Sequence, residues 1–190
     1  MTRYTIDIGK INTTMAKAIE VGVLACGNHV KNTISSSMAS RGRGKSSAPG
    51  TPPNRQTGNL SRSIQPHLVA PGVVRVGANE RYARIHELGG VIRPKAAKYL
   101  WIPVNAKGSE TPRSVIANKK AYTFIPRRSG GFFIVKKSKS GRKLKAGMIY
   151  VLSFGVYLAK RPYMRPGLEA AKPELPGIFA AAARKAFGVA

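Results

Sequence analysis

Acidic residues are scarce in this chain. Only 7 of its 190 residues are Asp or Glu, whereas 33 are Lys or Arg, so the formal net charge at pH 7 is +26. A two-metal nuclease or hydrolase site needs several carboxylates close together, and seven acids make such a site hard to assemble. A body of this charge repels itself, so we expect it beside polyanions or acidic protein partners.

Cysteine and histidine are also rare. The single Cys26 excludes an internal disulfide, and its place in an apolar helical pattern predicts a buried, unreactive thiol. His29, His67 and His86 are isolated in the sequence, so they do not form the cluster that a metal site needs. We therefore expect no metal and no cofactor, and one thiol fits synthesis in a reducing cytoplasm.

Long hydrophobic runs and enzyme motifs are missing as well. No run of about 18 apolar residues occurs, so we expect no transmembrane helix and no contact with a membrane. Residues 1–7 lack the apolar stretch of a signal peptide, which predicts that the chain is not secreted. The phosphate-binding loop, the dinucleotide glycine motif and the esterase nucleophile elbow are absent, so we expect no enzyme.

The first third of the chain has the pattern of one long helix. Apolar residues recur every three or four positions from Ile8 to Met38, which is the period of one helix face. Gly22 and Gly27 each lower the intrinsic helix propensity by roughly 1 kcal/mol relative to Ala, so packing must stabilise this helix. The serines at 35–37 and the glycines after them are expected to end it.

The middle of the chain has strand patterns separated by turn residues. Residues 61–70 and 73–77 flank Pro71-Gly72 and predict a β-hairpin. Residues 121–125 and 132–136 predict a second hairpin around a glycine-containing turn. The other predicted strands are 91–93, 99–104 and 148–159. Residues 82–88 have the pattern of a short helix that Gly89-Gly90 ends.

The end of the chain is helical. Pro166 suits a first helical turn, and Pro173 and Pro176 are expected to break or kink this C-terminal helix. Helix, antiparallel strands and helix in this order predict an α+β fold. We expect a long N-terminal helix and a C-terminal helix packed on an antiparallel β-sheet, with long basic loops, in one domain of residues 1–190.

Two basic segments interrupt this fold. Residues 39–56 are rich in Pro, Gly, Ser and Arg and predict a flexible loop, and residues 105–147 form a basic insertion that contains the second hairpin. We expect both to contact a polyanion or an acidic partner. The candidate contacts are Arg41, Arg43, Lys45, Lys136, Lys137, Lys139, Arg142, Lys143 and Lys145.

The aromatic residues of the insertion allow two interpretations. Tyr122, Phe124, Phe132 and Phe133 lie among cations, and such rings can stack on unpaired bases. Alternatively, they form the core face of the hairpin, with the lysines on its solvent face. We favour the second interpretation, because a charge run is usually a solvated surface.

His86 and Glu87 resemble an acid–base pair, since a histidine and a carboxylate can together activate water. Adjacent residues of a helix, however, point about 100° apart and do not converge without help from other elements. We therefore expect His86 and Glu87 to hold a helix end or a subunit contact by hydrogen bonds rather than to catalyse hydrolysis.

Three short motifs stand in a fixed order. The first is Thr57-Gly58-Asn59-Leu60, followed by Arg62, Ser63 and Ile64 after a Pro-rich stretch. The second is Tyr82-Ala83, then His86-Glu87 and Leu88-Gly89. The third is Arg161-Pro162-Tyr163-Met164-Arg165-Pro166 before the last helix. Together with the N-terminal helix and the basic composition, they resemble the neck and tail-completion proteins of long-tailed bacteriophages, also described as virion morphogenesis or minor tail proteins.

The resemblance covers about two-thirds of the chain, and the basic insertion departs from it. It implies a structural virion protein that forms a homo-oligomeric ring at the head–tail junction and is needed for tail completion and head–tail joining. The implied ring is a hexamer, with a dodecamer as the alternative. The implied partners are a head-completion or connector protein, the tail tube or tail terminator protein, and DNA in the channel. The implied location is the neck of the virion, after assembly in the host cytoplasm.

The residues of the three motifs are the candidate subunit contacts: Thr57, Gly58, Leu60, Tyr82, His86, Glu87, Arg161 and Arg165. Arginine forks such as those at 161 and 165 suit carboxylates on a neighbouring chain, although each motif residue can also simply hold the fold together. The alternative function is a basic nucleic-acid-binding protein, such as a packaging or ribosome-associated factor.

Overall fold

The structure is a computed structural model, which describes residues 8–38, 47–108, 110–137 and 144–188. It is an α+β fold with a long N-terminal helix, C-terminal helices and antiparallel sheets, as the sequence predicts. The chain divides into two compact units. We call Met1–Gly89 with Ala159–Ala190 the helical unit, and Gly90–Leu158 the sheet unit. The division into two units does not test whether residues 1–190 fold as one domain, so the single domain stays a prediction.

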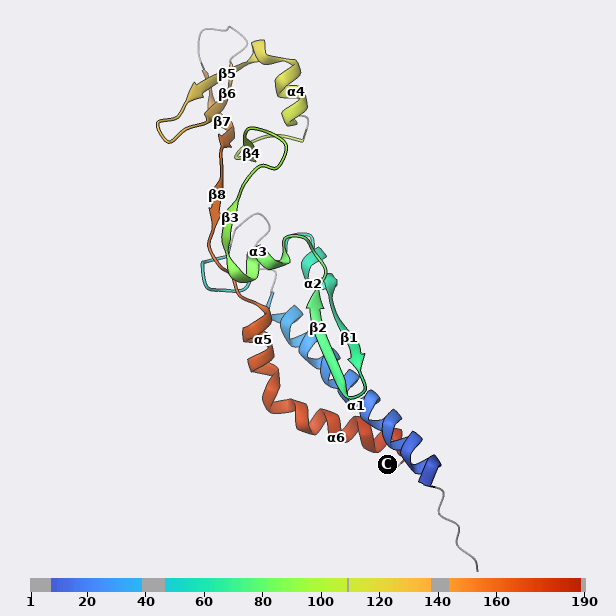
Figure 1. The fold of residues 1–190 in the computed structure, drawn as a ribbon. Helices are drawn as coiled ribbons and strands as arrows, with labels where there is room; N and C mark the ends of the chain where they lie inside the picture. Colours follow the sequence, from blue (N-terminus) through green and yellow to red (C-terminus); the bar gives the residue numbers. More distant parts are fainter. Residues whose placement is uncertain (1–7, 39–46, 109, 138–143, 189–190) are drawn as a thin grey trace, which may run out of the picture. The chain divides into compact units, whose positions relative to one another are not determined.

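The helical unit is built around helix α1, Ile8–Ser37, which begins and ends where the apolar period does. Strands β1, Ile64–Ala70, and β2, Val73–Ala78, form the predicted hairpin around Pro71-Gly72. In Figure 1 this hairpin lies along α1, and helices α5 and α6 contact α1 as well. The helix α5 spans Met164–Ala171, the 3₁₀ turn η2 spans Lys172–Glu174, and α6 spans Leu175–Ala186.

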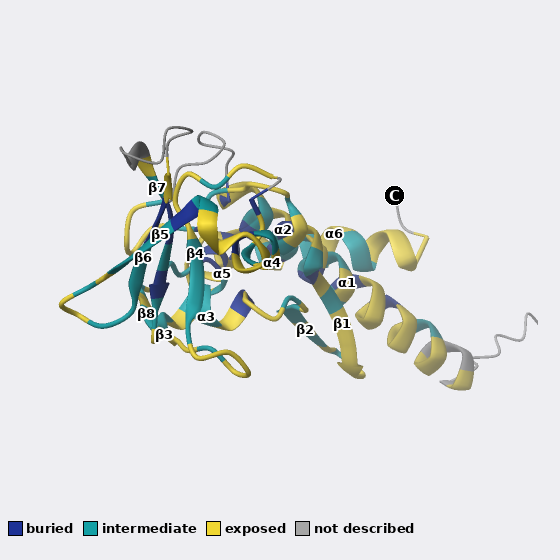
Figure 2. Ribbon diagram, turned by 90° about the horizontal axis from the view of Figure 1, so that it is seen from above, coloured by how far each residue is buried: buried dark blue, intermediate teal, exposed yellow. Residues whose placement is uncertain are grey.

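The core of the helical unit lies where α1, the hairpin and α5 meet. Its buried members are Val30, Ile34, Met38, Ile64, Tyr163 and Ala171. Gly167 of α5 allows this approach, because a Cβ there would overlap the Ile34 side chain and stand 3.0 Å from the Ile34 Cα. Most other residues of α1 are exposed or half-buried, as the colours of Figure 2 show. The stability of α1 therefore depends on one packed stripe.

Two short helices complete the helical unit. Helix α3, Ala83–Leu88, ends at Gly89, whose φ of 69° is the left-handed conformation that favours glycine. Helix α2 spans Asn59–Ser63, so the predicted strand over residues 61–70 was wrong in its first three residues. The strand begins at Ile64, because Gly58 and the hydroxyl groups after it start a helical turn first.

The sheet unit contains a ribbon and a four-stranded sheet, both antiparallel. Strands β3, Gly90–Ile92, and β8, Val156–Leu158, form the ribbon. The sheet has the order β4-β7-β6-β5. Its strands are β4, Leu100–Pro103; β5, Tyr122–Pro126; β6, Phe132–Lys137; and β7, Leu144–Ser153. The prediction of one strand over residues 148–159 was wrong. Strand β7 ends at Ser153, and the chain continues as β8, which pairs with β3 instead of β4 and β6.

The basic insertion holds more structure than the sequence indicated. Besides the predicted hairpin β5–β6, it contains helix α4, Pro112–Ala117, and the 3₁₀ turn η1, Lys119–Ala121. Val115 of α4 packs fully buried against the sheet core with Ile134 and Leu152. In the helical unit, α1 packs on the hairpin β1–β2, and α5 and α6 pack on α1. The four-stranded sheet belongs to the sheet unit.

Candidate functional site

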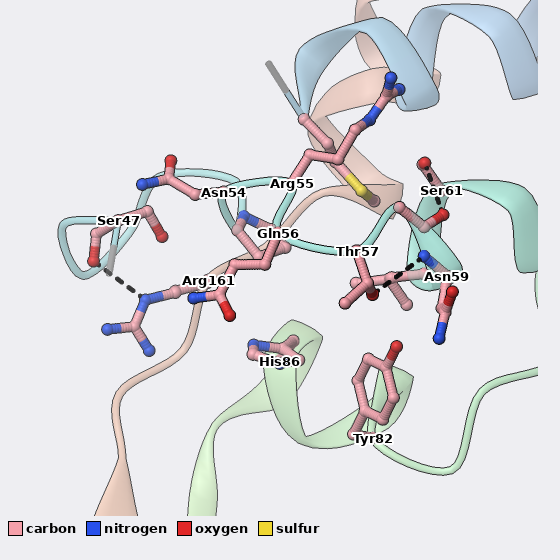
Figure 3. A pocket seen from close by; sticks show the side chains of 14 residues that line it. Ser47, Asn54, Arg55, Gln56, Thr57, Asn59, Ser61, Tyr82, His86 and Arg161 are labelled. Carbon is pink, nitrogen blue, oxygen red and sulfur yellow. Dashed lines mark hydrogen bonds between the residues drawn. The ribbon is translucent and has the colours of Figure 1, made fainter. Parts of the chain in front are cut away.

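The three sequence motifs meet at one cleft of the helical unit. The cleft has a volume of about 270 Å³. Figure 3 shows Thr57 and Asn59 of the first motif, Tyr82 and His86 of the second, and Arg161 of the third around it. Segments far apart in the sequence therefore converge on a single place. The remaining lining residues are Met38, Ser47, Pro53, Asn54, Arg55, Gln56, Gly58, Leu60 and Ser61.

The first motif forms the turn into α2. Gly58 has a φ of 80°, a conformation that strains other residues, and a Cβ there would stand 3.2 Å from the Arg62 guanidinium. The Ser61 hydroxyl donates to the Gly58 carbonyl at 3.0 Å, and the Arg62 guanidinium donates to the Thr57 carbonyl at 3.1 Å. Leu60 packs against the core of the helical unit. Gly58 and Leu60 thus serve the fold, while Thr57 stays exposed.

The second motif presents two rings to the cleft. Tyr82 and His86 pack edge to face with ring centroids 5.7 Å apart. The Nδ1 atom of His86 is buried and has no hydrogen-bond partner. Burial, together with the positive charge of Arg161, lowers the pKa of His86 below its usual value, so the imidazole is neutral at pH 7.

Glu87 points away from the cleft. Its carboxylate accepts backbone hydrogen bonds from Tyr163 at 2.7 Å, Met164 at 3.0 Å and Arg165 at 3.3 Å. These N–H groups start α5, where an α-helix lacks internal partners, so Glu87 caps that helix. The expectation that this pair holds a helix end is confirmed for Glu87. His86 and Glu87 do not converge, as their adjacent helical positions predict.

The two arginines of the third motif also differ in position, because Arg161 lines the cleft and Arg165 does not. The Arg161 side chain donates from Nε to the Ser47 carbonyl at 3.1 Å, and its backbone N–H donates to the His86 carbonyl at 2.6 Å. These two hydrogen bonds hold the loop at Ser47 and helix α3 beside Arg161 at the cleft. Arg165 is exposed and lies outside the cleft. The participation of Arg165 and Glu87 in subunit contacts stays a prediction.

Several cleft residues have no signal in the sequence. Ser47, Asn54 and Gln56 belong to a loop without a motif, and only its position in the fold brings it to His86 and Arg161. The Gly50 N–H donates to the Lys160 carbonyl at 2.9 Å, which holds this loop beside the third motif. A long-range contact of this kind has no local sequence pattern.

The predicted polyanion contacts are only partly described. Arg41, Arg43, Lys45, Lys139, Arg142 and Lys143 lie outside the described residues, and Lys145 lies in β7. Lys136 and Lys137 end β6 and are exposed. Lys136 donates to the buried Glu110. That hydrogen bond, with a second from the Lys107 backbone, lowers the pKa of Glu110.

The aromatic residues of the insertion mainly serve the core. Tyr122 is buried, and Phe124 and Phe132 pack against the same core cluster. The core-face interpretation is therefore confirmed for these three rings. Phe133 is half-buried, and the Arg127 guanidinium lies 5.1 Å from its ring centre.

Cys26 is half-buried rather than fully buried. Its thiol points to the Leu175 carbonyl at 3.5 Å, and burial raises its pKa. A raised pKa keeps the thiol protonated at neutral pH and makes it a poor nucleophile.

No family model, curated protein or solved structure matches this chain. Among the placed residues, no group of three or more His, Cys, Asp or Glu side chains could hold a metal ion. Within the same residues, every helix is too short or too polar to cross a bilayer. Among the described residues that line the cleft, Arg55 and Arg161 are cations, Met38, Pro53 and Leu60 are apolar, most of the others carry hydrogen-bonding groups, and none is a carboxylate.

Proposed function

We propose that this chain is a structural protein of a tailed-bacteriophage virion, which forms a closed homo-oligomeric ring at the head–tail junction. The ring completes the tail and joins it to the head, around the channel that DNA crosses. The observation that carries the proposal is the convergence of the three family-like motifs on one cleft.

The chemistry of the cleft supports docking over catalysis. Glu87, the only acid in the three motifs, is engaged by three backbone N–H groups of α5. Of the motif side chains at the cleft, Leu60 is apolar, and the others are donors or aromatic surfaces: Thr57, Asn59, Tyr82, His86 and Arg161. Tyrosine and arginine are enriched at protein interfaces, because each combines a large contact area with a polar tip.

The proposed head-side partner is a head-completion or connector protein, and the proposed tail-side partner is the tail tube or tail terminator protein. A hexamer is the expected ring, with a dodecamer as the alternative. Heterologous contacts close into a ring when their rotation divides a full turn. Assembly would take place in the host cytoplasm, and the mature location would be the virion neck.

Mass photometry and negative-stain electron microscopy test the ring directly. The purified chain should form closed rings of one size at physiological ionic strength, where salt screens the repulsion between cationic subunits. Rings that appear only after a head or tail component is added also fit. Monomers under every condition, alone and with purified head and tail components, would overturn the proposal.

Nucleic-acid binding is the second candidate function, and the charge of the sheet unit favours it. Residues 90–158 contain fifteen lysines and arginines and one acid, Glu110, which is buried and hydrogen-bonded to Lys136. Binding of a short DNA duplex at several salt concentrations separates the two functions. Tight binding near physiological salt with a steep salt dependence favours a nucleic-acid-binding protein, whereas binding that disappears at moderate salt favours the ring protein.

A further inference from the structure

A second hollow of the helical unit adjoins the cleft of the three motifs. This polar groove has a volume of about 900 Å³ and shares residues 55–58 and Ser61 with the cleft. Its walls come from α1, from the loop before α2, from α2 itself and from the start of β1. All of its lining residues belong to the helical unit, so the groove is a feature of one compact body.

The lining of the polar groove has the composition of a phosphate-contacting surface. Lys31, Arg55 and Arg62 are cations, and each of the other lining residues is Asn, Gln, Ser, Thr or Gly. In protein–DNA complexes, hydrogen bonds to phosphate and sugar come from these side chains and from backbone N–H groups. A protein-binding site instead centres on apolar or aromatic anchors, and no described residue of the groove supplies one. The composition therefore favours a nucleic-acid backbone over an acidic protein.

Two of the three charged ends are held at the polar groove by groups that line it. The Lys31 ammonium donates to the Gln65 side chain at 2.9 Å. The Arg55 guanidinium donates to the Ser35 carbonyl at 3.2 Å. In Figure 3 the Arg55 side chain accordingly points away from the cleft and toward α1. The charges of Lys31 and Arg55 therefore belong to the polar groove.

The third charged end, that of Arg62, is held in the same way. Its Nη2 atom donates to the Thr57 carbonyl at 3.1 Å and to the Asn59 side chain at 2.7 Å. A guanidinium has five N–H donors and an ammonium has three, so these bonds leave donors on every cation of the groove. Arg55 and Arg62 are exposed and Lys31 is half-buried, so a ligand can reach the remaining N–H groups.

Two of these cations approach the same glycine. A Cβ on Gly58 would stand 3.2 Å from the Arg62 Nη1 atom and 3.8 Å from the Arg55 Cδ atom. None of the described lining residues is an acid, and the sequence has no acid between Glu20 and Glu80. Like charges that are brought together without a carboxylate repel each other, and a bound anion removes this cost. The charge distribution of the groove therefore favours an anionic ligand.

We propose that the polar groove binds the phosphate backbone of a DNA duplex, with Lys31, Arg55 and Arg62 as contacts to phosphate oxygens. Such binding is independent of base sequence, because phosphate contacts carry no sequence information directly. A single strand is a poorer ligand, since the described lining offers no aromatic ring on which unpaired bases could stack. The proposal rests on the proposed function only in taking the duplex to be the DNA of the channel rather than RNA.

The test compares two double variants of the full chain. The groove variant is Lys31→Gln with Arg62→Gln, and the matched control is Lys17→Gln with Arg75→Gln. Both remove one lysine and one arginine from the helical unit, and the two control residues are exposed and lie outside the groove. Fluorescence anisotropy of a short labelled DNA duplex gives the affinity of each protein between about 50 and 200 mM salt.

The groove variant should bind the duplex about tenfold or more weakly, because it loses two phosphate contacts. Its plot of log affinity against log salt should be shallower by about 2, and the control should match the wild-type chain in both respects. Equal losses in the two double variants would overturn the proposal.

A footprint on the wild-type chain gives an independent result. Acetic anhydride modifies accessible lysines, and mass spectrometry reports the extent of modification at each one. The DNA duplex should protect Lys31 and leave Lys17 as reactive as in the free chain. Equal protection of the two lysines, or no protection of Lys31, would contradict the proposal. This footprint decides the matter if the groove variant fails to fold.

Other ligands give distinct results. A glutamate-rich peptide that protects Lys31 as strongly as a duplex of the same charge would assign the groove to an acidic protein and overturn the proposal. A single strand or an RNA duplex that binds more tightly than the DNA duplex, and that loses this affinity in the groove variant, would overturn the assignment to duplex DNA. Failure of the proposed function is a separate observation, because a chain that never forms rings can still bind a duplex through this groove.

Discussion

Replacement of Glu87 is expected to loosen the start of helix α5 and to destabilise the helical unit. The Glu87 carboxylate accepts N–H bonds from Tyr163, Met164 and Arg165 at 2.7, 3.0 and 3.3 Å. In Glu87→Ala all three N–H groups lose their acceptor. Tyr163 is 1 % exposed, so at this residue water cannot easily replace the carboxylate.

The expected loss of unfolding free energy follows from the individual hydrogen bonds. A hydrogen bond to a charged group contributes about 1.5–3 kcal/mol, and the loss of a helix cap typically costs about 1 kcal/mol and at most about 2. The bond to exposed Arg165 is long and can be replaced by water, so two bonds dominate. We expect Glu87→Ala to lower the free energy of unfolding by about 3 kcal/mol. Glu87→Gln keeps one acceptor oxygen and should lower it by about 1.5 kcal/mol.

Urea denaturation followed by far-ultraviolet circular dichroism measures these differences. The matched control is Glu169→Ala, which removes the same charge from an exposed pair between Glu169 of α5 and Lys172 of η2. The control should unfold at the wild-type urea midpoint, because exposed ion pairs contribute little. If Glu87→Ala and Glu169→Ala have the same urea midpoint, the Glu87 carboxylate does not cap α5 in solution.

Further measurements test other parts of the fold. Gly167→Ala should destabilise the chain by about 2 kcal/mol in urea denaturation, since its Cβ would overlap the buried Ile34 side chain. Gly177→Ala in α6, with no atom within 4 Å of its Cβ, should instead stabilise it by about 0.5–1 kcal/mol. The lowered pKa of Glu110 stabilises the fold above the pKa of the unfolded chain and should be lost on acidification, and Glu110→Gln should flatten that acid transition in a pH series. Burial raises the pKa of Tyr163 from 10.0 to about 12, so stability present below pH 10 should fall as pH rises toward about 12, and Tyr163→Phe should remove this alkaline loss.

Elements that depend on local residues were predictable from the sequence. The hairpin β1–β2 follows from alternating apolar residues around Pro71-Gly72, and the end of α3 follows from Gly89. The long helix α1 follows from its apolar period. In each case one segment contains its own signal, because the turn, the cap or the apolar face forms within it.

Helix α4 was missed although its signal is present. Thr111 caps the helix by accepting from the Ser114 N–H at 3.2 Å, and Pro112 occupies the first turn. The helix-start signal is short and lies in a segment whose most prominent feature is its positive charge. The break between β7 and β8 also has a local signal, because Ser153 and Gly155 interrupt the apolar run and the Ser153 hydroxyl donates to the Gly155 carbonyl at 2.7 Å.

The sequence indicated several residues of the candidate site, but it did not indicate that they meet in one cleft. The order of the three motifs selected Thr57, Tyr82, His86 and Arg161. Their meeting depends on long-range contacts, such as the Arg161 N–H bond to the His86 carbonyl. The loop at Ser47 is held at the cleft by Arg161 and by the Gly50 N–H bond to the Lys160 carbonyl. Such contacts arise when the helical unit packs, so no single segment encodes them.

The few acids of this chain explain how its positive charge can act on partners. Glu87 caps α5, Glu110 is buried against Lys136, Glu169 pairs with Lys172, and Glu174 faces His29. At least four of the seven carboxylates therefore have partners within the chain. Because so few acids remain to neutralise the exposed lysines and arginines, most of their charge must be balanced by other molecules. A protein built in this way is expected to fold alone but to reach its lowest free energy only beside an acidic neighbour or DNA.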